Sequence, residues 1–142
     1  MILLPIKKDC WAFYAIGKAD GSSPLLDELG SLPQNHQASA KRLLAIIHNA
    51  ASSPQGPRLL PKDICHRVND KYTINEFIAG RLRLLWFYSS AERKVVICTS
   101  VFMKKSQKTP KKIITAAIDN KKTYDKAVTD NNITILEDVK DE

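Results

Sequence analysis

The sequence lacks most of the residue patterns that identify common classes of enzyme. Three cysteines among 142 residues are an odd number, and no CxxC or Cys/His set accompanies them, so neither a zinc site nor a disulfide framework is indicated. There is no Gly-rich phosphate loop, no Ser/His/Asp set and no carboxylate cluster of the metal-ligand kind. We therefore expect no metal and no cofactor, and any phosphoryl chemistry would have to depend on positive charge.

Long apolar runs are also missing. The apolar stretch at 2–6 is too short for a signal peptide, and its lysines follow it instead of preceding it. No run approaches the length that spans a membrane. These absences predict a soluble, cytoplasmic protein without a membrane partner.

The length of 142 residues suits one domain. We expect this domain at 1–130 and an acidic C-terminal tail at 131–142. As an alternative for the tail, Ile133, Ile135 and Leu136 could add an edge strand to a sheet.

The apolar periodicity predicts strands and helices in one chain. Expected strands lie at 9–16, 72–79, 81–88 and 94–102, with a short one at 66–68; expected helices lie at 24–32, at 34–51 and after Thr109-Pro110. Pro24 after two serines is typical of a helix start, and so is Pro110 after Thr109. The predicted class is α+β, with two N-terminal helices packed on a small antiparallel sheet, followed by a C-terminal helix.

Positive charge is concentrated in one part of the chain. The net charge is +7, and the stretch from Lys104 to Lys122 holds seven lysines and one acid, Asp119. This stretch follows directly on an apolar strand pattern. Such a concentration indicates a polyanionic partner, for which nucleic acid is the best candidate; the alternative is charge that serves solubility.

Two arginines stand in the strand pattern at 81–88. Arg81 and Arg83 alternate with leucines, which predicts that both point to the same face of the sheet. A guanidinium remains charged and binds phosphate through two parallel hydrogen bonds. The alternative is a pair of exposed arginines on a solvated sheet face.

Antiparallel pairing of the strands at 81–88 and 94–102 would bring Lys104, Lys105 and Lys108 to the Arg81 end of the sheet. No general base stands out in the sequence. His66 is one candidate for a role. Glu76 could be a base or the partner of an arginine.

The segment from Tyr72 to Tyr124 resembles the phage-derived HigB-like branch of the RelE/ParE toxin superfamily. The specific part of the resemblance is the run Phe102-Met103-Lys104-Lys105-Ser106-Gln107-Lys108-Thr109-Pro110, which matches Phe-x-Lys-Lys-x-Gln-Lys-Thr-Pro. It follows an Arg-Leu-Leu-Trp-Phe-Tyr strand that begins at Arg83. Ile78 stands where members of the family often have an arginine.

The resemblance implies a RelE-like domain and a toxin of a type II toxin–antitoxin pair. Such a toxin is a metal-free endoribonuclease that cuts mRNA on the ribosome and so inhibits translation. A cognate antitoxin protein, which would carry a helix-turn-helix domain, is the expected second partner. The resemblance assigns catalysis to Arg83, Lys104 and Lys105.

Further basic residues would then contact the nucleic acid. These are Arg81, Lys108, Lys111, Lys112 and His66. Two other hypotheses remain open from the sequence: a non-catalytic basic binding module, and a toxin of the same superfamily that targets DNA gyrase.

Overall fold

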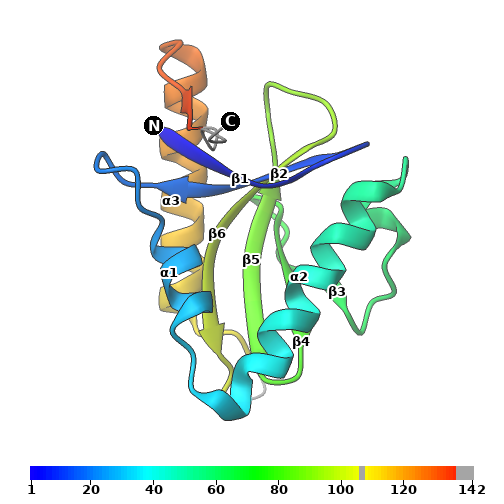
Figure 1. The fold of residues 1–142 in the computed structure, drawn as a ribbon. Coiled ribbons are helices and arrows are strands. Elements are labelled where there is room, and N and C mark those ends of the chain that lie inside the picture. Colours follow the sequence, from blue (N-terminus) through cyan, green and yellow to red (C-terminus); the bar gives the residue numbers. More distant parts are fainter. Residues whose placement is uncertain (106–107, 137–142) are drawn as a thin grey trace, which may run out of the picture.

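The structure is a computed structural model that describes residues 1–105 and 108–136, and Figure 1 shows its fold. The strands are β1 (Ile2–Lys8), β2 (Ala12–Gly17), β3 (Cys65–Asn69), β4 (Ile74–Ala79), β5 (Leu82–Tyr88), β6 (Val95–Met103) and β7 (Thr134–Ile135). The α-helices are α1 (Pro24–Gly30), α2 (Gln37–Ser52) and α3 (Lys111–Thr129), and the 3₁₀ helices are η1 (Gln34–His36) and η2 (Gly56–Leu59).

All seven strands form one mixed sheet in the order β3-β4-β5-β6-β2-β1-β7. Strands β3 to β6 make an antiparallel meander, and β1 pairs antiparallel with β2. Two pairings are parallel: β2 lies beside β6, and the short β7 lies beside β1. The central strand β6 therefore joins the meander to the N-terminal hairpin.

The helices cover both faces of the sheet (Figure 1). Helices α1 and α2 pack on one face through Leu25, Leu43 and Ile47, which contact sheet residues such as Trp86. Helix α3 packs on the other face, where Ala117 and Tyr124 contact residues such as Phe87. The odd and even residues of a strand point to opposite faces, so each central strand contributes to both cores.

The predicted arrangement of two N-terminal helices on a small antiparallel sheet is wrong. The chain begins with the β1–β2 hairpin, and the sheet has seven strands and is mixed. Strand β1 was not predicted because it contains Pro5, and proline is rare inside paired strands. It is accommodated because β7 pairs with β1 only at Ile2 and Leu3, and because the β1–β2 register shifts between Pro5 and Lys7.

Several individual elements lie where the periodicity predicted them. The expected strands at 72–79, 81–88 and 94–102 correspond to β4, β5 and β6, and the weak signal at 66–68 corresponds to β3. The Ser23 hydroxyl caps α1 by accepting a hydrogen bond from the Leu26 amide, with Pro24 in the first turn. The alternative edge strand near the C-terminus is confirmed as β7, whereas 137–142 of the expected tail lie outside the described residues.

Across residues 1–105 and 108–136, every helix is too short or too polar to cross a membrane.

Candidate functional site

Arg83 lies in β5, between Ile78 of β4 and Phe102 of β6. Its neighbours Leu82 and Leu84 are buried on the face that α1 and α2 cover. Strand alternation therefore puts Arg83 on the α3 face. Its side chain is only 11% exposed.

The Arg83 guanidinium is held by the turn between β4 and β5. Its Nη1 donates hydrogen bonds to the carbonyls of Gly80, at 2.8 Å, and Leu82, at 3.0 Å. Its Nε lies 3.7 Å from Oε1 of Glu76, which is an ion-pair distance but too long for a hydrogen bond. That Nε is buried and has no hydrogen-bond partner among the described residues. The guanidinium is thus held in one orientation, and its buried Nε donor has no hydrogen-bond partner among the described residues.

Glu76 is fully buried, which is rare for a carboxylate and costly unless the charge is paired. Its Oε1 lies 2.8 Å from His66 Nε2, and its Oε2 accepts a 2.9 Å hydrogen bond from the Thr109 hydroxyl. With Arg83, these partners come from β3, β5 and the loop before α3. We call the four residues His66, Glu76, Arg83 and Thr109 the Glu76 cluster.

Thr109 was expected to cap α3, and this prediction is wrong. The N-cap position is Pro110, which makes no side-chain capping hydrogen bond. The Thr109 hydroxyl turns to Glu76 instead. A single hydroxyl therefore links the residue before α3 to strand β4.

His66 is the accessible member of the Glu76 cluster, because its side chain is 40% exposed. An ionised carboxylate can only accept hydrogen bonds, so Nε2 carries the proton when it faces Glu76. The lone pair then lies on Nδ1, which is the arrangement in which a histidine accepts a proton. The sequence offered no reason to connect His66 with Glu76, since ten positions and a turn separate them.

Arg81 lies in the two-residue turn between β4 and β5 and is exposed. Strand β5 begins at Leu82, so the predicted alternation of Arg81 with Arg83 does not hold. The expected meeting of the two strand ends is confirmed, because the Lys104 amide donates a 2.8 Å hydrogen bond to the Arg81 carbonyl.

The predicted lysines follow β6 at the same end of the sheet. Lys104 is half-buried and Lys105 is exposed. Lys108, Lys111 and Lys112 are exposed at the entrance to α3. Within 1–105 and 108–136, the ammonium groups of Lys104 and Lys105 form no hydrogen bond or ion pair with Glu76. These basic residues are neighbours at one sheet end, and only Arg83 belongs to the buried cluster.

A sequence model of the phage-derived Gp49-like proteins matches residues 27–122. The chain belongs to this family. Gp49-like proteins are a toxin-like family. No curated protein matches the chain. The Gp49-like segment runs from α1 into α3 and includes the whole Glu76 cluster, whereas β1, β2 and β7 lie outside it.

Proposed function

We propose that this protein is the toxin of a type II toxin–antitoxin pair and that it cleaves mRNA on the ribosome without a metal ion. Two findings support the proposal: the Gp49-like family is toxin-like, and basic residues surround the Glu76 cluster. The observation that carries it is the Arg83 guanidinium, held beside a buried carboxylate at the sheet end where the lysines gather.

In the proposed reaction, the ribose 2′-oxygen attacks the adjacent phosphorus while the bond from phosphorus to the 5′-oxygen breaks. The products are a 2′,3′-cyclic phosphate and a 5′-hydroxyl. Nδ1 of His66 accepts the proton of the attacking hydroxyl, and Glu76 orients the imidazole from the other side. A neighbouring ammonium, for which Lys104 and Lys105 are the candidates, supplies a proton to the leaving oxygen.

Arg83, Lys104 and Lys105 would stabilise the negative charge that develops on the phosphate. Fixed cations stabilise such charge well because they need no reorganisation during the reaction. Arg83 is already oriented by two backbone carbonyls.

The surrounding basic residues would hold the RNA by its phosphates. They are the exposed Arg81, Lys108, Lys111 and Lys112, whereas His66, which the sequence placed among them, takes the role of general base. Contacts of this kind are independent of sequence and weaken steeply with salt. An antitoxin that carries a helix-turn-helix domain would inhibit the toxin by covering these charges. A small adjacent open reading frame with that pattern would support this partner.

The test is primer extension on cellular transcripts after induction of the wild type, Arg83→Ala and His66→Gln. We expect new 5′ ends with the wild type and a loss of cleavage of about 10²-fold or more with Arg83→Ala. Arg42→Ala is the matched control, because Arg42 is an exposed arginine on α2, which covers the opposite face. Thermal unfolding of each variant shows whether it is folded.

The site assignment is contradicted if Arg83→Ala combined with Lys104→Ala leaves both growth arrest and transcript cleavage intact. One observation favours a second candidate, a non-catalytic toxin that binds a protein target such as DNA gyrase. The Arg83 side chain is mostly buried and its Nη1 is engaged with two carbonyls, as a purely structural arginine would be. Growth arrest with intact transcripts would favour this candidate.

A further inference from the structure

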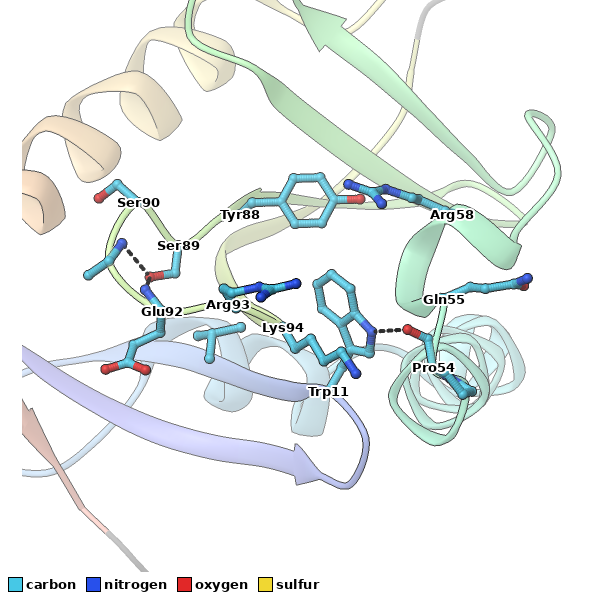
Figure 2. Close-up of a pocket in the computed structure, with 12 residues that line it drawn as sticks. Trp11, Pro54, Gln55, Arg58, Tyr88, Ser89, Ser90, Glu92, Arg93 and Lys94 are labelled. Carbon is cyan, nitrogen blue, oxygen red and sulfur yellow. Dashed lines mark hydrogen bonds between the residues drawn. The ribbon is translucent and has the colours of Figure 1, made fainter.

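A second basic region lies at the other end of β5. There a cavity of about 860 Å³ opens between the end of β5, the start of β6 and the loop after α2 (Figure 2). Its volume falls within the range of small-molecule sites. Residues that line it include Trp11, Arg58, Tyr88, Glu92, Arg93 and Lys94. We call it the Trp11 pocket.

Two aromatic side chains form part of the wall of the Trp11 pocket. The rings of Trp11 and Tyr88 lie 5.8 Å apart and are tilted by 55°. The indole Nε1 donates a 3.0 Å hydrogen bond to the Pro54 carbonyl, which holds the ring in place (Figure 2). Gly56 packs against the same ring, so that a Cβ at this position would collide with the indole. The aromatic wall is therefore rigid; Tyr88 is its more exposed ring, and Trp11 is 7% exposed.

Three cationic side chains and one acidic side chain line this pocket. The cations are Arg58, Arg93 and Lys94, and the acid is Glu92. Burial raises the pKa of the Tyr88 hydroxyl, and the nearby positive charge of the Arg58 guanidinium opposes that rise. Figure 2 shows Arg58 at the hydroxyl end of Tyr88 and Glu92 beyond Ser89. Among the described residues, none of the three cations forms an ion pair with a carboxylate. The three cations therefore outnumber the single acid of the pocket, and none of them is directly paired with it.

We propose that the Trp11 pocket binds a nucleotide unit, with its base against Trp11 and Tyr88 and its phosphate on Arg58, Arg93 and Lys94. Aromatic side chains beside a cationic groove are the combination that binds single-stranded nucleic acid. An acidic peptide would satisfy the cations but would leave the aromatic surface uncovered. A strand of RNA and a free nucleotide both present a base and a phosphate, and the experiment distinguishes between these two ligands.

This site is separate from the one proposed for cleavage. Trp11 and Tyr88 pack with the core under α1 and α2, whereas Arg83 points to the α3 face from the opposite end of β5. A nucleotide in the Trp11 pocket therefore anchors RNA at a distance from Arg83. The binding proposed here does not depend on whether the protein cleaves RNA.

Quenching of Trp11 fluorescence measures the binding directly. The purified protein is titrated with three probes: hexauridine RNA, uridine monophosphate and polyglutamate. We expect saturable quenching with the RNA that disappears in Trp11→Phe, since Trp86, the second tryptophan, is buried in the core. Arg58→Gln with Arg93→Gln should weaken binding about tenfold or more. Arg42→Gln with Lys41→Gln, exposed on α2, is the matched control.

The outcomes separate the sources of the ligand. Quenching by hexauridine alone assigns the pocket to an RNA strand, and equal quenching by uridine monophosphate assigns it to a free nucleotide. The proposal is overturned if neither nucleotide probe quenches Trp11, if the arginine variants bind as the wild type does, or if only polyglutamate binds. Trp11 quenching is measured separately from transcript cleavage, so failure here and failure of the cleavage proposal are distinguishable.

Discussion

Both ends of β5 carry cationic side chains, but the arginines at the two ends differ in burial and in pairing with a carboxylate. At the first end, Arg83 is mostly buried, its Nη1 is bonded to backbone carbonyls, and Glu76 opposes its charge. At the second end, Arg58 and Arg93 are exposed, and no carboxylate pairs with them among the described residues. A buried counter-charge orients a cation precisely, whereas an unpaired exposed cation is available to bind a ligand. The first arrangement suits catalysis, and the second suits recruitment.

The largest expected effect comes from removing the buried carboxylate. Glu76→Ala should lower the free energy of unfolding by about 3 kcal/mol or more, because it leaves the Arg83 charge buried without its partner. Urea unfolding measures this. Glu76→Gln keeps an oxygen acceptor for Thr109 and should cost less. At the other end, Glu92→Ala should change stability by no more than about 0.5 kcal/mol, because Glu92 is exposed. Equal losses at Glu76 and Glu92 would contradict the contrast between the two ends.

Two glycines test how rigid each end is. Gly56, which packs against the Trp11 ring, has φ +61°, and Gly80, in the turn beside Arg83, has φ +58°. A Cβ at Gly56 would meet the fixed indole, whereas one at Gly80 would meet the Ser39 hydroxyl, which can rotate. Gly56→Ala should cost about 2–3 kcal/mol and Gly80→Ala about 1 kcal/mol. A larger loss for Gly80→Ala in thermal unfolding would show that the indole yields more easily than the turn.

The Thr109 hydroxyl should make a smaller contribution. Thr109→Val keeps the shape and removes the donor to Glu76, which should cost about 1–2 kcal/mol. Thr115→Val is the control, since Thr115 is exposed on α3. If the two substitutions have the same effect in urea unfolding, then Thr109 does not stabilise the buried carboxylate.

At neutral pH the smallest effect concerns Cys65 in β3. Burial, with a further contribution from the Glu76 charge, raises the pKa of this thiol from its ordinary 9.0 to about 12. The unfolded chain loses this proton near pH 9 and the folded chain does not, so stability falls as the pH rises from 9 towards 12.

Alkylation rates as a function of pH report the Cys65 pKa directly. Glu76→Gln should shift the reaction of Cys65 to lower pH. The pKa of Cys98 is raised by burial alone, so Cys98 is an internal control that the same substitution should leave unchanged. If the pH profile of Cys65 alkylation is the same in Glu76→Gln as in the wild type, then the Glu76 charge does not affect the pKa of the thiol.

Strongly periodic segments could be predicted from the sequence, and long-range partnerships could not. Strands β4, β5 and β6 and helix α2 each carry a local apolar repeat, so these elements could be predicted from the sequence. Strand β1 was missed because Pro5 interrupts its pattern, and the parallel pairing of β2 with β6 has no local signature. The predicted fold was wrong because it lacked strand β1 and the parallel pairing, which together make the sheet larger and mixed.

The site shows the same division. The gathering of Arg81, Arg83 and Lys104 at one sheet end followed from the pairing of adjacent strands. The Glu76 cluster did not, because Glu76 collects its partners from β3, from β5 and from the loop before α3. Sequence reasoning offered Glu76 as the partner of an arginine but held no signal for its contacts with the Thr109 hydroxyl or with His66.

The parallel pairing of Ala12 with Val95 and of Ala15 with Cys98 has a consequence for synthesis. A ribosome that has translated the N-terminal hairpin and the first two helices has not yet made the strand against which the hairpin closes. Until β6 leaves the exit tunnel, the edge of β2 that pairs with β6 keeps its backbone N–H and C=O groups unpaired, and nascent chains at that stage are candidates for chaperone capture. The cationic sheet end therefore forms only after β6 and the lysines that follow it have been translated.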